Sequence, residues 1–264
     1  MTYTTIVYEK KEHIAYLTLN RPKVINAMSR QMYAELYQAL LDFRDDPAMW
    51  VAILSGAGEK GFSSGHDLRE DTLGGFAEEM QSGFWREDDP AMAIYWGLQV
   101  WKPIIAAIHG YCLAGALELA LSCDIRIAAE DAKFGLSEVL RGLLPGGGGP
   151  QRLPRVVPMG IALEILLTGD MIDAQEAYRI GLVNHVVPVA ELMTKAEAVA
   201  RKICANPPLT VRAIKESTMR GLDLPLEQAL RLNKFLARIN RDTEDSREGP
   251  RAFIEKRPAR YKGR

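Results

Sequence analysis

The feature that most constrains the fold is residues 103–123, the most apolar stretch of this 264-residue chain. The stretch has the length of a membrane span, about 20 residues. It is interrupted, however, by His109, Gly110, Gly115 and Glu118, and ionisable groups are costly in the hydrocarbon layer of a membrane. We therefore interpret the stretch as the buried core of a globular protein.

Hydrophobic periodicity divides this region into strands and a helix. Residues 102–108 are predicted to form a strand, residues 113–122 a short apolar helix, and residues 124–128 a second strand. Periodicity and turn signals predict the remaining elements in the same way. Further strands are expected within residues 6–19 and over 51–54, 134–139 and 182–187, and helices over 29–45, 91–101, 161–167, 173–180, 192–204, 209–219 and 226–239, with another starting at Pro150. The chain is thus predicted to be an α/β protein with one core of alternating elements and a helical C-terminal region.

Composition and charge exclude several classes of protein. With 47% hydrophobic and 25% charged residues the chain has the composition of a globular protein, and a net charge of -1 gives no support to nucleic-acid binding. Three cysteines without C-x-x-C spacing argue against a disulfide framework or a zinc site, so we expect reduced thiols and no metal. The N-terminus lacks a basic start followed by an apolar block, so we expect a cytoplasmic protein without membrane partners.

The small net charge averages over two unlike segments. Residues 65–89 are rich in acidic side chains within a long, poorly patterned stretch, and long loops are often functional. The last ten residues contain five basic side chains, Lys256, Arg257, Arg260, Lys262 and Arg264. Such a run is either a solvated tail or an anion-binding segment, and composition leaves both interpretations open.

Glu118 and Glu138 are acids in apolar surroundings. The predicted helix around Glu118 has no cation three or four residues away, so a carboxylate is costly there unless it is paired or lines a cavity. Glu138 lies in a second, mostly apolar segment. Two such carboxyls suit acid/base chemistry on a neutral substrate, because one can activate water and the other can deliver a proton. The alternative is a glutamate at a helix edge that reaches solvent or a distant arginine.

Two glycine-containing turns are candidates for binding through backbone amides. Gly115 lies in the first turn of the predicted Glu118 helix, where N–H groups lack intrahelical acceptors. Residues 63–67 form the second turn, and if the two sets of amides face each other they make an oxyanion hole. Residues 146–149 are interpreted as a turn rather than a nucleotide loop, because no Lys-Ser/Thr pair follows them.

Several motifs, in order, resemble the enoyl-CoA hydratase/isomerase, or crotonase, family. They are Asn20-Arg21-Pro22 with Asn26-Ala27, FSSGHDL at residues 62–68, KPIIAAIHGYCLAGALELALSCDIRIAAEDAKFGLSE at 102–138 and GLLPGGGGPQRLPR at 142–155. The similarity covers nearly the whole chain. It implies a crotonase-like spiral of ββα units with the active site over residues 1–190, and a helical C-terminal oligomerisation region, which builds trimers, over residues 191–264.

The resemblance also implies a role for each matching residue. Glu118 and Glu138 fall on the family's two catalytic glutamates, the first acting mainly on water as a base and the second exchanging the proton at the α-carbon. The backbone amides of His66 and Gly115 would bind the thioester oxygen, and that of Gly146 would help to hold the water. No permanent cofactor is implied, because coenzyme A enters with the substrate. It would contact Lys23, Val24, Ala27, Ser64, Asp67 and Leu68 and, from a neighbouring subunit, Phe253 and Lys256.

The activity implied by the resemblance is the reversible hydration of a trans-2-enoyl-CoA to a 3-hydroxyacyl-CoA, by a homotrimer or a dimer of trimers. Retention of both Glu118 and Glu138 favours water chemistry, since two acid/base roles need two groups. Double-bond isomerisation, or another dehydratase or lyase reaction of the family, is the alternative among enzymes. A non-catalytic acyl-CoA-binding or RNA-binding relative is the alternative of a different class.

The sequence departs from the family pattern near the acyl group. His66 stands where alanine is common, and we expect its ring to pack outward because only its amide is needed. Ala114 and Ala116 replace frequent glycines, and Pro150 replaces a frequent threonine. The loop over residues 67–102 borders the acyl pocket in the family, is longer than in short-chain hydratases, and contains Trp85, Tyr95, Trp96 and Trp101. The resemblance therefore says least about the acyl group.

Overall fold

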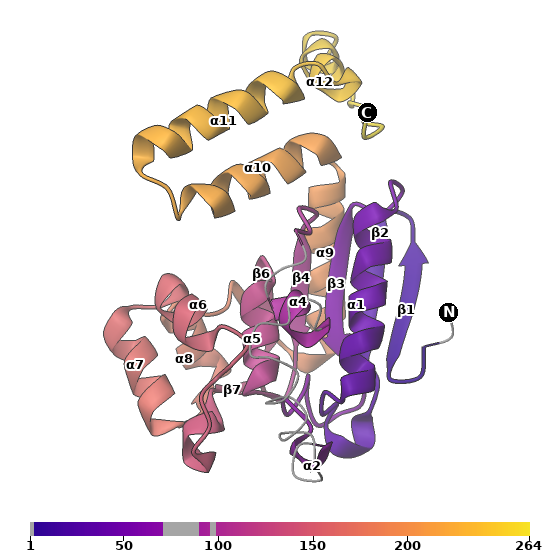
Figure 1. Cartoon of the computed structure of the whole chain (residues 1–264). Coiled ribbons are helices and arrows are strands. Elements are labelled where there is room, and N and C mark those ends of the chain that lie inside the picture. Colours follow the sequence, from indigo (N-terminus) through magenta and orange to yellow (C-terminus); the bar gives the residue numbers. More distant parts are fainter. Residues whose placement is uncertain (1–2, 71–89, 96–98) are drawn as a thin grey trace.

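The main sheet of the protein has six strands, in the order β1-β2-β3-β4-β6-β9 (Figure 1). The computed structural model describes residues 3–70, 90–95 and 99–264. The first two strands pair antiparallel and the other neighbours pair parallel. The strands are β1 (Ile6–Lys11), β2 (Ile14–Leu19), β3 (Val51–Gly56), β4 (Ile104–Ile108), β6 (Ile125–Ala129) and β9 (His185–Val187).

The structure has a second sheet, which consists of three short strands. They are β5 (Tyr111–Leu113), β7 (Lys133–Gly135) and β8 (Ile172–Asp173). β7 lies between the other two, parallel to β5 and antiparallel to β8. Ser63 forms a parallel bridge with Cys112 of β5, so the segment after β3 lies beside this sheet.

Helices cover both faces of the main sheet. α1 (Arg30–Asp45) begins where the Ser29 hydroxyl accepts a hydrogen bond from the Met32 amide at 3.2 Å. It packs on one face through residues such as Leu36 and Phe43, whereas α9 (Leu192–Cys204) covers the other face. The other helices of the body are η1 (Pro22–Val24), α2 (Leu68–Glu70), α4 (Pro90–Tyr95), α5 (Gly115–Ser122), η3 (Ser137–Arg141), α6 (Gly149–Val156), α7 (Met159–Thr168), α8 (Ala174–Arg179) and η4 (Val189–Glu191).

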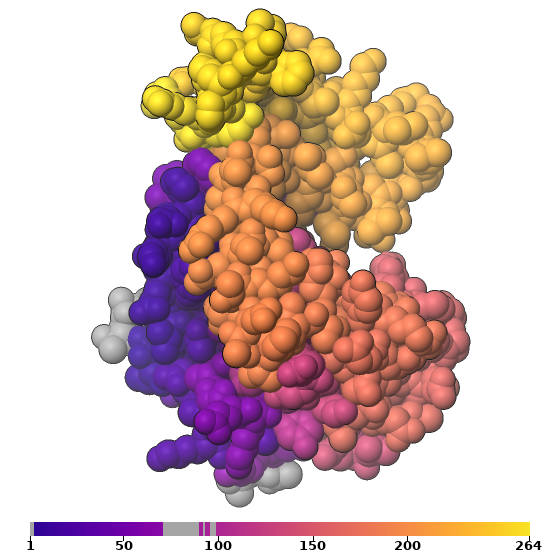
Figure 2. Space-filling model, turned by 180° about the vertical axis from the view of Figure 1, so that it is seen from behind, coloured from indigo at the N-terminus to yellow at the C-terminus, as the bar shows by residue number. Residues whose placement is uncertain are grey.

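The C-terminal helices extend away from this body. α10 (Pro208–Gly221) and α11 (Leu226–Asn240) lie side by side, and α12 (Glu244–Ile254) follows at the far end (Figure 1). Seen from behind, their gold residues are separated by a hollow from the pink part of the body, whereas the yellow residues rest on the orange ones (Figure 2). α9, in contrast, packs on the main sheet. The predicted division at residue 190 therefore separates the chain before a helix that belongs to the core packing.

Most predicted elements are confirmed, and three predictions are wrong in part. The second half of the strand predicted over residues 134–139 is the 3-10 helix η3. The helix predicted over residues 91–101 is described as α4 up to Tyr95, and residues 99–101 are not helical. α12 was not predicted, because Gly249 and Pro250 interrupt its pattern; in the structure Thr243 caps its N-terminus and Pro250 lies inside the helix.

Three further properties follow from the side chains. Cys112 and Cys123 are buried, Cys204 is half-buried, and all three thiols are free, as predicted. Within residues 3–70, 90–95 and 99–264, every helix is too short or too polar to span a lipid bilayer. In those same ranges no group of three or more His, Cys, Asp or Glu side chains is arranged to hold a metal ion.

Candidate active site

Glu118 is placed by α5 and held by the glycine turn that leads into α6. It lies in the first turn of α5 and is only 3% exposed. The amide of Gly149 donates to its Oε1 atom at 2.7 Å, and the Gly147 amide also hydrogen-bonds the carboxylate. The N–H groups at a helix start have no intrahelical acceptor, so this turn has donors to offer. The predicted apolar setting of Glu118 is confirmed, and backbone amides are its hydrogen-bond partners.

Two opposing effects set the pKa of Glu118. Burial raises it above the usual value, because the charged form loses its hydration. The hydrogen bonds from Gly149 and Gly147 and the positive charge of Arg152 lower it. The carboxylate is thus buried but stabilised by fixed donors.

Glu138 lies in a different environment. It comes from η3, directly after β7, and is only partly buried as a residue. Its Oε2 atom, however, is buried and has no hydrogen-bond partner among the described residues. Burial, together with the charge of Glu118, raises the pKa of Glu138 to about 7. This carboxyl therefore holds a proton much more readily than an ordinary glutamate.

Tyr95, the last residue of α4, lies between these groups and Gly115. Its hydroxyl donates to the Gly115 carbonyl at 3.2 Å and pairs with the Tyr33 hydroxyl at 2.7 Å. A Cβ atom added to Gly147 would lie 2.9 Å from its ring. Burial raises the pKa of Tyr95, and the charges of Tyr33, Glu118 and Glu138 raise it further. Sequence reasoning included Tyr95 only as one aromatic residue of a long loop.

The two predicted amide turns meet at the start of α5. A Cβ atom added to Gly65 would lie 2.7 Å from the Leu113 carbonyl and 3.2 Å from the Gly115 nitrogen. The φ angle of Gly65 is +92°, a conformation that favours glycine. His66 follows at once and forms a parallel bridge with Met28. The structure therefore brings His66 and Gly115 to the same end of α5.

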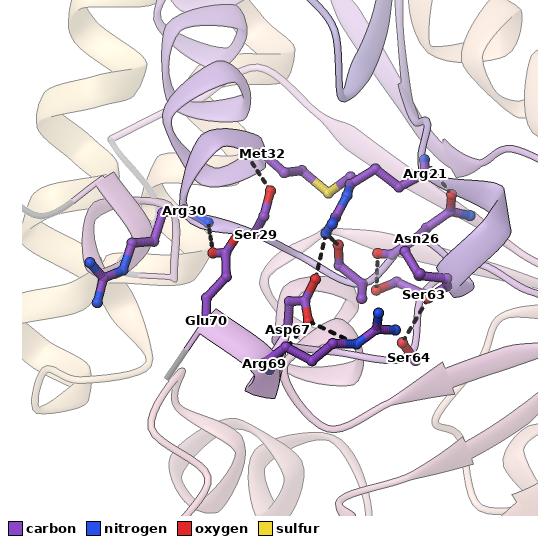
Figure 3. Close-up of polar contacts among 12 residues, drawn as sticks. Arg21, Asn26, Ser29, Arg30, Met32, Ser63, Ser64, Asp67, Arg69 and Glu70 are labelled. Atoms are coloured by element: carbon purple, nitrogen blue, oxygen red, sulfur yellow. Dashed lines mark hydrogen bonds and ion pairs between the residues drawn. The ribbon is translucent and has the colours of Figure 1, made fainter. Parts of the chain in front are cut away.

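A polar network holds the segment 61–67 in this position (Figure 3). The Asn26 side chain is fully buried and donates to the carbonyls of Ala57, Gly61 and Phe62 at 2.9 to 3.1 Å. Because a buried amide is costly without partners, these three bonds fix one segment against the other. Asn26 belongs to one of the motifs that carry the family resemblance, but the sequence assigned no role to its side chain.

Asp67 completes this network from the other side of His66. Its carboxylate accepts from Arg21 at 2.9 Å, and the same guanidinium donates to the Ala27 carbonyl at 2.5 Å (Figure 3). Burial alone would raise the pKa of Asp67, but the hydrogen bond and charge of Arg21 hold it below the usual value. The Asp67 side chain is therefore occupied by Arg21, and the amides of Ser64 and Asp67 donate to the carbonyls of Ile25 and Met28.

The residues predicted to contact coenzyme A fall into two groups. Lys23, Val24, Ala27, Ser64, Asp67 and Leu68 lie together, because the Ser64 hydroxyl and amide bind the carbonyls of Val24 and Ile25 at 3.4 and 2.9 Å. Phe253 and Lys256 lie at the end of α12, at the opposite end of the molecule (Figure 1). Both are exposed, and Phe253 is 85% exposed. Within one chain these two residues do not reach the first group.

Part of the basic C-terminal tail is neutralised within the chain. Arg257 pairs with Glu248 at 2.6 Å, and Arg264 pairs with Glu244 at 3.2 Å. The tail is thus docked on α12 rather than simply solvated.

Gly146 differs from its neighbours in the glycine turn. It is exposed, and a Cβ atom added to it would meet nothing within 4 Å. Gly147 and Gly149, by contrast, are buried and bind Glu118. Sequence reasoning treated the three glycines as one turn, since a glycine run does not show which amide faces a carboxylate.

The departures from the family pattern can be located in part. The His66 ring was expected to pack outward, and this is wrong: it stacks on the buried Tyr33, with ring centroids 5.7 Å apart, because Tyr33 offers an apolar face beside it. Ala114 has a φ of +52° and a ψ of -128°, a conformation that favours glycine. Trp101 packs under the Arg220 guanidinium, 4.9 Å from its ring centroid. Trp85, Trp96 and most of the predicted acidic segment lie outside the described residues.

Comparison with known proteins decides the family. The sequence model of the enoyl-CoA hydratase/isomerase family matches residues 9–264. The chain belongs to this family. It is 42% identical over 258 residues to (E)-benzylidenesuccinyl-CoA hydratase of Thauera aromatica, covering 98% of this chain and 99% of that protein. It is 39% identical over 263 residues to crotonyl-CoA hydratase of Syntrophomonas wolfei, covering 99% of both.

The fold of the family is confirmed in solved structures. The crystal structure of enoyl-CoA hydratase from Bacillus anthracis superimposes with a TM-score of 0.91 at 39% identity, covering 99% of this chain and 100% of that one. The enoyl-CoA hydratase subunit I from Geobacillus kaustophilus superimposes with a TM-score of 0.90 at 35% identity, covering 99% of both chains. The predicted α/β crotonase-like fold with a helical C-terminal region is therefore confirmed for this member of the enoyl-CoA hydratase/isomerase family.

Proposed function

We propose that this protein catalyses the reversible hydration of a trans-2-enoyl-CoA thioester to a 3-hydroxyacyl-CoA. The observation that carries the proposal is the unlike pair of carboxyls. Glu118 is held by two amides, whereas Glu138 has a pKa of about 7 and a buried oxygen without a hydrogen-bond partner in the part of the chain that the structure describes. A carboxylate held by backbone donors suits a base, and a carboxyl with a pKa of about 7 suits an acid in the same site. The names of the relatives, which include crotonyl-CoA and benzylidenesuccinyl-CoA hydratases, support the same reaction class.

In the proposed reaction, Glu118 is the base. It takes a proton from a water molecule whose oxygen forms a bond to C3 of the enoyl group. The electron pair of the C2–C3 double bond moves toward the thioester carbonyl, giving an enolate. Glu138 then delivers its proton to C2. In the dehydration direction the roles are reversed: Glu138 removes the proton from C2, and Glu118 returns its proton to the oxygen that leaves C3 as water.

The thioester oxygen gains negative charge in the enolate, and backbone donors would stabilise it. We assign these donors to the amides of His66 and Gly115, which lie at one end of α5. The Gly146 amide, in the exposed part of the glycine turn, would help to hold the water. No permanent cofactor is needed for this chemistry, because the activating thioester is part of the substrate.

Coenzyme A would lie along the segment from Lys23 to Ala27 and the backbone of residues 64–68. Phe253 and Lys256 would then come from a neighbouring subunit, because they lie at the far end of their own chain (Figure 1). Self-association as a homotrimer or a dimer of trimers is supported by an exposed apolar surface on α10 and α11. Its residues are Ile214, Met219, Leu222, Leu226, Leu230, Phe235 and Ile239.

The test is to follow hydration of crotonyl-CoA and of longer and aromatic enoyl-CoA thioesters with wild type, Glu118→Gln and Glu138→Gln. We expect each variant to lose about two or more orders of magnitude in kcat, as for loss of a general acid or base. Normal hydration by either variant would refute the two-carboxyl mechanism. Proton exchange in deuterated water without addition of water would instead identify an isomerase.

A further inference from the structure

Arg152, on α6, joins the two segments that lie on either side of Glu118. One nitrogen of its guanidinium, Nη1, donates to the Gly147 carbonyl at 2.7 Å, and the other, Nη2, donates to the Tyr95 carbonyl. The glycine turn and the end of α4 are far apart in the sequence. A single planar side chain therefore ties them together, which suits arginine because its donors are fixed in one plane.

The contact with Gly147 is next to the bond that holds Glu118. The N–H of Gly147 hydrogen-bonds the Glu118 carboxylate, and the carbonyl of the same residue accepts from Arg152. Gly147 is thus fixed from both sides. A glycine has no side chain to restrict its backbone, so without the guanidinium this residue would lose the contact that orients it.

Arg152 makes no ion pair with Glu118 or another acid among the described residues. Burial lowers the pKa of Arg152. The negative charge of Glu118 raises it, and the positive charge of Arg155 lowers it. Arg152 is half-buried, and among the described residues its guanidinium donates to two carbonyls rather than to an acid. Partial withdrawal of this charge from water has a cost, which the two hydrogen bonds offset.

We propose that Arg152 is a positioning residue for the hydration, which orients the Gly147 amide toward Glu118 and holds Tyr95 against the same turn. The inference rests on the proposed function. It predicts that Arg152 affects the chemical step and the ionisation of Glu118 more than the binding of the thioester.

The test compares Arg152→Ala and Arg152→Lys with Arg155→Ala as the matched control. Arg155 lies one turn further along α6, is exposed, and donates to the Gln151 carbonyl at 2.6 Å, away from the glycine turn. For Arg152→Ala we expect kcat to fall about 10- to 100-fold, the effect of losing one charged hydrogen bond. KM should stay within about threefold of wild type, and Arg155→Ala should retain the wild-type values.

Two measurements separate positioning from a merely structural role. The acid limb of the kcat pH profile should move to higher pH in Arg152→Ala, because the charge of Arg152 lowers the pKa of Glu118. Tyr95 and Cys123 also interact with Arg152, but their pKa values lie above the usual range, so neither titrates on the acid limb. The pKa of Glu138 depends on burial, Glu118 and Arg141 rather than on Arg152. Added guanidinium, at a concentration that leaves the wild type folded, should restore part of the activity, whereas methylammonium should not.

The outcomes distinguish this inference from the proposed function. If the wild type hydrates no enoyl-CoA, the proposed function fails. If the wild type is active, an unchanged kcat in Arg152→Ala refutes the inference, as does a lowered kcat with an unmoved pH profile and no guanidinium rescue. Should the alanine variant not fold, Arg152→Lys decides: one ammonium cannot span both carbonyls, so a wild-type kcat in the lysine variant overturns the inference.

Discussion

Gly147 offers the sharpest test of how the turn before α6 controls Glu118. A Cβ atom added at this position would lie 2.7 Å from Glu118 Oε2 and 2.9 Å from the Tyr95 ring. Ordinary contacts begin at 3.4 Å, so the carboxylate or the turn must move by about 0.7 Å. Because the Gly147 amide hydrogen-bonds the carboxylate, a movement of this size breaks or weakens that bond.

The magnitude follows from the type of bond. A hydrogen bond to a charged group contributes about 1.5 to 3 kcal/mol. If Gly147→Ala removes it from the ionised form of Glu118, the pKa of this glutamate rises further above its usual value. The same loss slows the chemical step about 10- to 100-fold. The overpacked turn should also lower the free energy of unfolding by about 1 to 3 kcal/mol.

The assay is the initial rate of enoyl-CoA hydration across a range of pH, with urea unfolding of the same samples. Gly160→Ala, in α7, is the matched control, because its Cβ atom would meet nothing within 4 Å. We expect the control to hydrate at the wild-type rate. A folded Gly147→Ala protein with a wild-type rate and pH profile, or an equally slow Gly160→Ala protein, would refute the reasoning.

Four further predictions concern three neighbouring residues. In Gly115→Val, contact with the Tyr95 hydroxyl, which would lie 2.8 Å from the new Cβ atom, should block the amide; turnover should fall about 100-fold or more, and unchanged rates in folded protein would show that this amide is not used. Glu138 has a pKa of about 7 and must be protonated to act as the acid, so hydration in wild type should decline as the pH rises through this value. Because its pKa is raised on folding, the wild-type free energy of unfolding falls as the pH rises from the unfolded to the folded pKa of Glu138. Glu138→Gln should therefore be more stable than wild type at pH 8 by on the order of 1 kcal/mol. A difference in urea midpoint between variant and wild type that is the same at pH 5 and pH 8 would contradict this. Ala114→Gly relieves a φ of +52° and should raise the free energy of unfolding by up to about 1 kcal/mol, whereas a loss of stability in urea would show that the alanine is not strained.

The elements that were predictable depend on contacts between neighbours in the sequence. The helix predicted over residues 192–204 matches α9, because its apolar stripe and its ends are local signals. The start of α1 at Ser29 and of α8 at Asp173 was predictable for the same reason, since each cap bonds an amide three residues later. η3 was not predictable, because its apolar residues fit a strand equally well.

For the candidate site, the sequence indicated several residues but not which of them contact one another. Glu118 stood out as an acid in an apolar helix, and Glu138 as a second one. Their motifs sufficed for the resemblance to the family that the comparisons confirm. Arg152 and Asn26 went unassigned, since an arginine in a helix and an asparagine in a turn are ordinary until their partners are known.

The sequence by itself therefore determined the α/β class, the order of most strands and helices, the family, and the two acids that could carry the chemistry. Only the tertiary structure decided which amides hold Glu118, since its partner Gly149 is 31 residues away along the chain. It alone showed that an oxygen of Glu138 is buried without a partner among residues 3–70, 90–95 and 99–264, and that the pKa of this carboxyl is about 7. The physical reason is that helices and turns follow from bonds within a few residues, whereas ionisation depends on desolvation and charge, which are set by segments that meet only when the chain folds.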